Sequence, residues 1–320
     1  MNFQQLRIVR ETVKQNFNLT EVANALYTSQ SGVSRNIKEL EEELGLLLYV
    51  RKGKRLLGMT KPGEDLLVMA EKILNEAANI KRLAQNFAQP KVGKLVIATT
   101  HTQARYALPE VIKEFRVHYP LVKLVIYQGS PKDILTMVQN GEADIGIASE
   151  LLAENGGIAT FEYYQWHHRV IAPSNHPLAD EKSLTLEQLV QWPLITYHRG
   201  LTGRSNIDRA FATQEQQPEI VLSAQDSDVI KTYVSLGMGV GIIAEKAIHS
   251  DEDSSLVRID ASHLFATNTV WLGVKSHKLQ PDYTHFFLNL CNPSLSLDDI
   301  HAEIYRDKSA LNYAGFNYQI

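Results

Sequence analysis

Apolar residues recur at helical spacing in two short runs between residues 18 and 45, separated by a polar turn, and this pattern predicts a helix-turn-helix. Asn18 suits the N-cap of the first helix, and Glu21 three positions later would complete a capping box. Ser29 suits the N-cap of the second helix, which Gly45 would end. The apolar stripe of the second helix holds Val33, Ile37, Leu40 and Leu44.

The other face of the second helix is polar. It carries Gln30, Ser31, Ser34, Arg35 and Lys38. Such side chains hydrogen-bond to base edges and phosphates when a recognition helix lies in the major groove. A helical hairpin in an ordinary bundle would show the same pattern with this face simply solvated, and the pattern alone supports both interpretations equally.

Basic residues follow the predicted helices directly and favour the DNA-binding interpretation. Gly53 lies in the middle of a turn surrounded by Arg51, Lys52, Lys54 and Arg55. A hairpin at this place forms a wing whose charges attract the phosphate backbone. A solvated turn is the alternative, but the position just after a helix-turn-helix favours phosphate contact.

A long helix with one apolar stripe is predicted for residues 61–89. Pro62 is a good first helical residue. The stripe alternates three and four residues through Leu66, Ala70, Ile73, Ala77, Ile80, Ala84 and Phe87. A helix of about 26 residues spans roughly 39 Å. We expect this linker helix to form a dimer, because two copies of a DNA-binding head are needed to recognise a site made of two half-sites. Packing on its own domain is the alternative.

Short apolar segments alternate with amphipathic stretches after residue 93, which predicts an α/β domain with largely parallel strands. Ligands bind such domains outside the carboxyl ends of the strands. The expected strands are 95–99, 122–127, 144–148, 170–172, 194–197, 220–223, 240–244 and 269–274.

Charge is distributed unevenly along the 320 residues, whose net charge is only -4. Residues 1–90 carry 13 Lys and Arg against 10 Asp and Glu, and the remainder carries 19 against 26. A basic head on an acidic body concentrates the attraction for DNA at one end.

Other functional classes find little support. The single cysteine, Cys291, excludes an internal disulfide and a CxxC metal site, and no apolar run approaches membrane-spanning length. We therefore expect a cytoplasmic protein. Adjacent His167 and His168 would point to opposite faces of a strand, so no metal site and no cofactor are expected. The glycines of residues 237–241 lack the strand-turn-helix context of a dinucleotide fingerprint. No catalytic residues are identified.

The N-terminal motifs resemble those of the LysR-type transcriptional regulators. They are VANAL at 22–26, SQSGVS at 29–34, LE at 40–41, LG at 44–45, Arg51 and MTKPG at 59–63. Two mild departures are Tyr49, where Phe is usual, and Gly32, where Ala is common. The resemblance implies a winged helix-turn-helix at 1–60, the linker helix at 61–89 and a two-lobed, periplasmic-binding-protein-like effector domain at 93–295. Lobe 1 would hold about 93–163 and 268–295 and lobe 2 about 164–267, with a C-terminal tail at 296–320.

Motifs in the second half are similar to the CysB/Cbl subfamily of these regulators. They are IATTHTQARY at 97–106, QGSP at 128–131, AD at 143–144, TGRS at 202–205 and DSDVIKTY at 226–233. KRLLGMT at 54–60, NTVWLG at 268–273 and YQI at 318–320 favour the Cbl-like branch. This similarity implies an activator of sulfur-assimilation or sulfonate-utilisation genes that binds promoter DNA and RNA polymerase. It also implies a homo-oligomer, dimer or tetramer, that responds to sulfate, adenylylsulfate or an acetylserine.

An anion site is expected where strands meet helices, because hydroxyls and free backbone N–H groups converge there. The expected effector-binding residues are Thr100, Thr102, Gln103, Ser149, Trp166 and Thr202. Ser149 departs from the Thr associated with the subfamily. The alternative is that each hydroxyl merely caps a helix.

One rival interpretation of the whole chain stays open at this point. The protein would be a cytoplasmic small-molecule binding protein or an enzyme, and its basic N-terminal domain would serve assembly.

Overall fold

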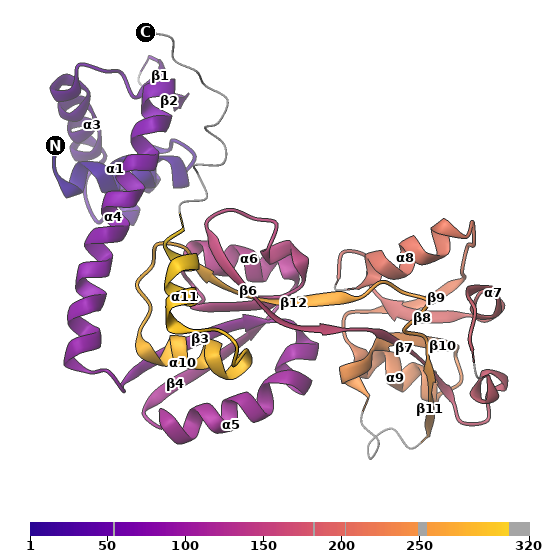
Figure 1. Ribbon diagram of the computed structural model, residues 1–320. Helices are drawn as coiled ribbons and strands as arrows, with labels where there is room; N and C mark the ends of the chain where they lie inside the picture. Colours follow the sequence, from indigo (N-terminus) through magenta and orange to yellow (C-terminus); the bar gives the residue numbers. More distant parts are fainter. Residues whose placement is uncertain (54, 182, 202, 249–254, 307–320) are drawn as a thin grey trace, which may run out of the picture. The chain divides into compact units, whose positions relative to one another are not determined.

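The computed structural model describes residues 1–53, 55–181, 183–201, 203–248 and 255–306 (Figure 1). The chain forms two compact units. The first holds Met1–Ala88 with His277–Leu279, and the second holds the rest. No helix in the described ranges is both long and apolar enough to cross a membrane.

The first unit is a winged helix-turn-helix followed by a long helix, as expected. Its core packs Ile8 and Val9 against Val33, Ile37 and Leu40, which form the apolar stripe expected for the second helix of the motif. Its elements are α1 (Phe3–Lys14), α2 (Leu19–Ala25), α3 (Gln30–Leu44), β1 (Tyr49–Lys52), β2 (Arg55–Met59) and α4 (Lys61–Ala88).

The ends of the two motif helices follow from local sequence. The Asn18 side chain accepts the backbone N–H groups of Thr20 and Glu21, and Ser29 accepts that of Gly32 at 3.1 Å. Gly45 ends α3 in the left-handed region at φ 66°, where glycine carries no steric penalty. The expected caps are therefore confirmed. The reciprocal bond by which the Glu21 side chain would complete the capping box does not form.

The expected apolar stripe of helix α4 is buried within its own unit in one part and exposed to solvent in another. Ala70 packs with Leu74 against Leu6 of α1, inside its own unit. By contrast, Ile73, Ile80 and Phe87, each seven residues apart, are exposed, Ile80 by 69% and Phe87 by 82%. This spacing keeps the exposed apolar side chains on one side of the helix.

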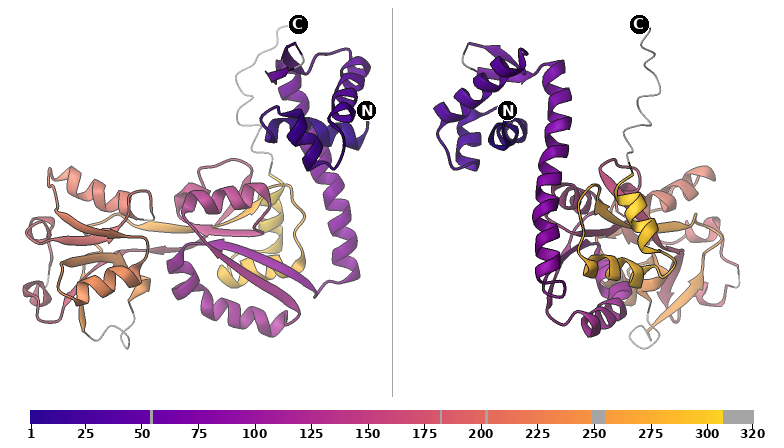
Figure 2. Two further views of the ribbon diagram at one scale, coloured as in Figure 1. Left: turned by 180° about the vertical axis from the view of Figure 1, so that it is seen from behind. Right: turned by 60° about the vertical axis from the view of Figure 1, so that its left-hand side comes forward.

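The second unit contains two five-stranded sheets, one per lobe (Figures 1 and 2). In lobe 1 the strand order is β4-β3-β5-β12-β6, with β3 parallel to β4 and β5. Helix α6 packs on one face, and α5, α10 and α11 pack on the other. The elements are β3 (Gly93–Thr99), η1 (Gln103–Ala107), α5 (Leu108–His118), β4 (Val122–Gln128), α6 (Pro131–Asn140), β5 (Ile145–Ala148), η2 (Glu150–Leu152), β6 (Ile158–Trp166), β12 (Asn268–Lys275), α10 (Asp282–Cys291) and α11 (Leu297–Ile304).

Lobe 2 has the strand order β11-β7-β10-β8-β9, in which β8 is parallel to both β9 and β10. Helix α8 packs on one face of this sheet through Ile207 and Phe211. Helix α9 packs on the other face through Ile230 and Val234. The elements are β7 (His168–Pro173), η3 (Pro177–Asp180), α7 (Leu186–Leu189), β8 (Leu194–Tyr197), α8 (Arg204–Thr213), β9 (Ile220–Ala224), α9 (Ser227–Ser235), β10 (Val240–Ala244), η4 (Glu245–Ala247) and β11 (Leu256–Asp260).

The lobes are joined by two crossings whose positions refine the expected boundaries. The first crossing lies at His167, between β6 and β7, rather than near residue 163. The second lies just before Asn268, where β12 returns to lobe 1. Each of the eight expected strands is present. Two further strands, β6 and β11, lie at the edges of the two sheets and were not predicted from the sequence.

The expected C-terminal tail at 296–320 begins instead as part of lobe 1. Residues Leu297–Ile304 form helix α11, capped by Ser296, and Ile300 and Ile304 are buried in the lobe 1 core. The burial of two isoleucines on one face explains why this segment folds. The remainder of the expected tail, residues 307–320, lies outside the described residues.

Candidate DNA interface and candidate effector site

Helix α3 presents the expected polar face to solvent. Gln30, Ser31, Arg35 and Lys38 are exposed and Ser34 is half-buried. Arg35 pairs with Glu39 at 2.8 Å and Lys38 pairs with Glu42 at 3.4 Å, each one turn along the helix. Such exposed pairs contribute about 0.3–0.5 kcal/mol, so both cations remain available to a phosphate.

The wing contains one arginine that is held inside its own unit. The Arg51 guanidinium donates to the buried Glu41 carboxylate at 2.6 Å, and the same carboxylate accepts the Leu48 N–H at 2.8 Å. Arg51 therefore ties the wing to α3. Lys52 and Arg55 are exposed, while Lys54 lies outside the described residues.

Tyr27 is a surface residue to which the sequence assigned no role beyond the turn. Its side chain is 97% exposed, and its backbone adopts φ 52° in the turn before α3, three residues ahead of Gln30. A left-handed conformation is uncommon for a residue other than glycine. The signal in the sequence was an aromatic residue in the short turn between the two predicted helices, next to the expected DNA-binding face.

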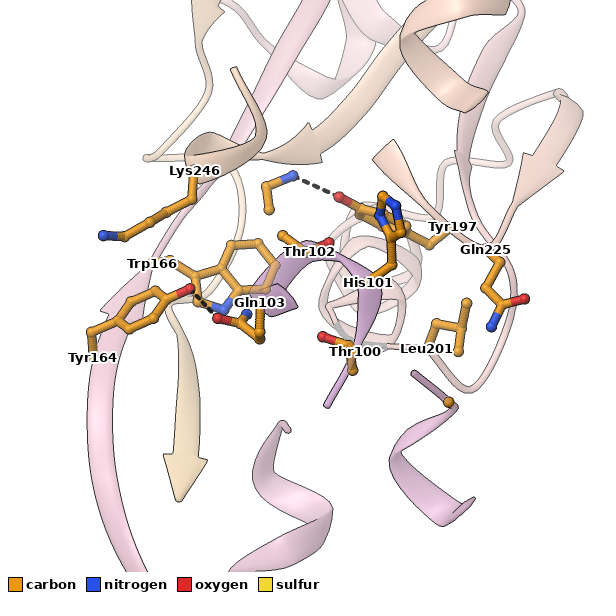
Figure 3. Close-up of a pocket in the computed structure, with 12 residues that line it drawn as sticks. Thr100, His101, Thr102, Gln103, Tyr164, Trp166, Tyr197, Leu201, Gln225 and Lys246 are labelled. Atoms are coloured by element: carbon orange, nitrogen blue, oxygen red, sulfur yellow. Dashed lines mark hydrogen bonds between the residues drawn. The ribbon is translucent and has the colours of Figure 1, made fainter. Parts of the chain in front are cut away.

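The candidate effector site is a small pocket between the two lobes (Figure 3). It lies beyond the carboxyl ends of parallel strands in both sheets, the usual ligand position in α/β domains. Its lining consists of Thr100, His101, Thr102, Gln103, Gly129, Tyr164, Trp166, Tyr197, Leu201, Gln225, Ala244 and Lys246.

Four of the six expected effector residues meet in this pocket: Thr100, Thr102, Gln103 and Trp166. The structure does not bring Ser149 into the lining. Its side chain is buried after β5, at the start of η2. Thr202 lies outside the described residues, although its neighbour Leu201 lines the pocket.

Hydrogen-bond donors predominate among the polar groups of the pocket. The buried indole N–H of Trp166 has no hydrogen-bond partner among the described residues. The Tyr164 hydroxyl donates to Gln103 Oε1 at 2.6 Å, so the Gln103 amide N–H groups are left for another acceptor. Lys246 brings a positive charge, with Nζ 4.5 Å from the centroid of the Tyr164 ring.

The described lining of the pocket includes no aspartate or glutamate. Thr102 also stands at the start of η1, a π-helix, where backbone N–H groups lack helical acceptors. Neutral donors, one cation and a helix start together create a positive potential. The arrangement suits an anion better than a cation or a neutral molecule.

Charged side chains beside the pocket join the two lobes. From lobe 1, the Tyr106 hydroxyl hydrogen-bonds to Asp228 of lobe 2, and Arg105 Nε lies 3.1 Å from the same carboxylate. Lys231 lies 3.2 Å from Asp228 and hydrogen-bonds to Tyr106 at 3.0 Å. Burial by itself raises the pKa of Asp228, but hydrogen bonds from Tyr106 and Lys231 outweigh it and lower the pKa. The charged Asp228 is thus the centre of an interlobe bridge.

Asp228 also belongs to a group with His101 and Asp226 whose ligand atoms lie within 4.8 Å of one another. Two features argue against a metal ion there. Arg105 and Lys231 already neutralise Asp228, and Asp226 caps α9 by accepting the Val229 N–H. A divalent cation would meet both positive charges at close range.

Several pocket residues were not identified from the sequence. Tyr164 had a local signal, because it lies two residues before Trp166 on the same strand and therefore on the same face. Tyr197 and Lys246 had none, because they come from lobe 2 and only folding brings them to η1. Burial raises the pKa of Tyr197 to about 12, and its hydroxyl bonds to Ser227 at 2.7 Å and to the Ala244 N–H at 2.9 Å.

Known proteins similar to this chain identify the family of its two domains. Residues 3–64 match the family described as bacterial regulatory helix-turn-helix protein, lysR family, and residues 88–295 match the LysR substrate binding domain. The HTH-type transcriptional regulator cbl of Escherichia coli (strain K12) is 58% identical over 304 residues, covering 95% of this chain and 96% of that protein. The regulator SsuR of Burkholderia cenocepacia is 50% identical over 300 residues, covering 94% and 97%.

Solved structures agree as well. The crystal structure of the cofactor-binding domain of the Cbl transcriptional regulator matches with a TM-score of 0.65 and 54% identity, covering 67% of this chain and 93% of that chain. Full-length CbnR in complex with its target DNA matches in fold, with a TM-score of 0.55 and 19% identity, covering 92% and 100%. The similar proteins are regulators and not enzymes, which disfavours the rival interpretation. The chain belongs to the LysR family of transcriptional regulators.

Proposed function

We propose that this regulator binds promoter DNA through α3 and the wing, and that its interlobe pocket senses a small oxyanion of sulfur metabolism. The convergence of Thr100, Thr102, Gln103 and Trp166 on one pocket rich in donors carries the proposal. Sulfate, adenylylsulfate and an acetylserine are the candidate effectors. The similarity to the regulators named Cbl, SsuR and CysB supports control of sulfur-assimilation or sulfonate-utilisation genes, mainly as an activator.

The same proposal includes assembly and partners. The exposed stripe Ile73, Ile80 and Phe87 on α4 supports a dimer, or a tetramer built from dimers. An activator of this kind would also contact RNA polymerase at the promoter. We place the protein in the cytoplasm, where its DNA target lies.

Replacing Arg55 and replacing Arg51, the two arginines of the wing, are expected to affect different properties: DNA binding and stability. Arg55→Ala should weaken binding to every DNA sequence alike and reduce the salt slope by about 0.9, because a phosphate contact releases counterions but distinguishes no bases. Arg51→Ala should instead lower the unfolding temperature, because it leaves the buried Glu41 carboxylate unpaired. Electrophoretic shift titrations at several salt concentrations and thermal melts measure the two effects.

Residues on α3, unlike Arg55 of the wing, are expected to affect the base-pair preference of DNA binding. Removing Gln30 or Arg35 is expected to cost about 1–3 kcal/mol and to relax sequence preference at particular base pairs. If the Gln30, Arg35 and Arg55 variants all retained parental affinity, preference and salt slope, the DNA-binding assignment of this face would be wrong.

The interlobe bridge gives a prediction for the pocket. Asp228→Asn removes ion pairs with Arg105 and Lys231 while keeping the size of the side chain. Lobes that open more readily should hold an anion less tightly, by about 1 kcal/mol or roughly fivefold, in isothermal titrations with sulfate. Asp299→Asn is the matched control, since Asp299 is an exposed lobe 1 carboxylate that bonds to Ser296 and does not line the pocket. Equal sulfate affinities for both variants would show that the bridge does not support the pocket.

A direct test of the whole proposal combines DNA and effector. Promoter fragments are titrated in shift assays with and without sulfate, adenylylsulfate or O-acetylserine. Binding of each compound is followed in parallel by tryptophan fluorescence, to which Trp166 in the pocket contributes. A compound that quenches fluorescence and also changes promoter binding supports the proposal, whereas a protein that binds DNA but none of the three compounds contradicts the effector half.

A further inference from the structure

We propose that Tyr164 is a positioning residue that holds the Gln103 amide with its N–H groups toward the ligand, and so makes the pocket prefer fully deprotonated oxyanions. The inference rests on the proposed function and deepens it, because it names the charge and protonation state that the pocket selects. Sulfate is the inorganic example of the favoured class and phosphate that of the disfavoured one.

The position of the amide follows from one contact. Gln103 is only 4% exposed, and the single hydrogen bond that its side chain makes within the described residues joins Oε1 to the Tyr164 hydroxyl at 2.6 Å. Figure 3 shows the two side chains pointing toward one another at the edge of the pocket. A glutamine amide has one oxygen and one NH2 group, so fixing the oxygen on Tyr164 also fixes the NH2 group.

Tyr164 is suited to act as the donor in this bond. Burial is the main cause that raises its pKa, so the phenol keeps its proton at physiological pH. The Lys246 ammonium lies over the ring, 4.5 Å from its centroid. The ring attracts a cation at this position, and the contact helps to hold the Tyr164 ring in place. Because Lys246 comes from lobe 2, this contact forms when the lobes are together.

The direction of the amide determines which anion fits. Sulfate carries no proton at neutral pH and only accepts hydrogen bonds, so it pairs with the Gln103 N–H groups and the Trp166 indole. Phosphate keeps at least one proton at neutral pH, and that proton requires an acceptor. The Gln103 oxygen is already engaged by Tyr164, and the described lining holds no carboxylate, so only neutral acceptors such as hydroxyl groups remain for this proton. A hydrogen bond to a neutral acceptor is weaker than one to a carboxylate, which disfavours phosphate.

The test is isothermal titration of the full-length protein with sulfate and with phosphate. Tyr164→Phe releases the Gln103 amide, which then turns its oxygen toward the ligand in part of the molecules. We expect sulfate affinity to fall about tenfold, because this is the effect of losing one hydrogen bond to a charged group. The preference for sulfate over phosphate should become smaller. Tyr163→Phe is the matched control, because the Tyr163 hydroxyl faces the Ala107 carbonyl oxygen at 3.4 Å and does not line the pocket.

A double-mutant cycle separates positioning from general damage to the site. In a Gln103→Ala background, Tyr164→Phe should change sulfate affinity no further, because Tyr164 acts through the missing amide. Gln103→Glu provides an independent variant that leaves Tyr164 intact. It presents an acceptor to the ligand, and the sulfate-to-phosphate preference should fall at least tenfold.

Each outcome has a defined meaning. Parental sulfate affinity in Tyr164→Phe, the same tenfold loss in the Gln103→Ala background, or an unchanged preference in Gln103→Glu overturns the inference and leaves the proposed function standing. A parent protein that binds neither sulfate nor phosphate, while binding adenylylsulfate or O-acetylserine, overturns the inference alone. If the parent binds none of the four compounds, the proposed effector function is wrong and the inference with it.

Discussion

Replacing Ile80 with aspartate is expected to separate the oligomer into protomers. Ile80 is 69% exposed on α4, between Ile73 and Phe87 at heptad spacing, and an exposed apolar stripe of this kind is buried when two helices pair. An aspartate at that position would place an unpaired charge between the helices, which costs on the order of several kcal/mol. Light scattering at micromolar concentration measures the change in mass.

Gln85→Asp is the matched control for this prediction. It introduces the same charge on the same helix, at an exposed position off the apolar stripe. We expect the control to keep the parental mass and affinity for promoter DNA. An Ile80→Asp protein with the mass of the parent would show that the stripe does not hold the oligomer together.

Thr100→Val is expected to weaken the binding of the anionic effector about 10- to 150-fold. The substitution keeps the size of the side chain but removes a hydroxyl that lines the pocket, and a hydrogen bond to a charged partner contributes about 1.5–3 kcal/mol. Thr102→Val should act in the same direction, and so should Thr202→Val on the basis of the sequence. Titrations with sulfate, adenylylsulfate and O-acetylserine measure the loss.

The head should be unaffected by these pocket changes. Thr100→Val is expected to bind promoter DNA like the parent without effector, and to lose the effector-dependent change. Thr136→Val is the matched control, because Thr136 is exposed on α6 and bonds only to the Lys132 carbonyl oxygen. A Thr100 variant that bound all three compounds as tightly as this control would remove Thr100 from the effector site.

Local patterns were sufficient to predict the helix-turn-helix. Asn18, Ser29 and Gly45 delimit their helices through contacts with residues no more than four positions away, so their roles can be recognised in a short window of sequence. Continuous apolar segments revealed the buried strands of both sheets for the same reason. The partly exposed edge strands β6 and β11 were missed because they lack such segments.

Roles that depend on distant partners were predicted less well. For Arg51 the sequence predicted a phosphate contact and did not reveal the ion pair with Glu41, ten residues earlier. Ser149 follows a strand as expected and is buried, but it is not among the residues that line the pocket. In both cases the neighbouring element determines the role, and sequence spacing does not reveal which element that is.

The sequence by itself therefore determined the winged head, the linker helix, the α/β class and four of the residues that line the interlobe pocket, because periodicity and capping act within a few residues. Only the tertiary structure decided which side chains surround those four. Tyr164 of lobe 1 and Lys246 of lobe 2 meet beside Gln103, and Asp228 bridges to Tyr106, across sequence separations of 61 to 122 residues. Contacts at such separations depend on how the sheets pair and how the chain crosses between lobes, which no local pattern specifies.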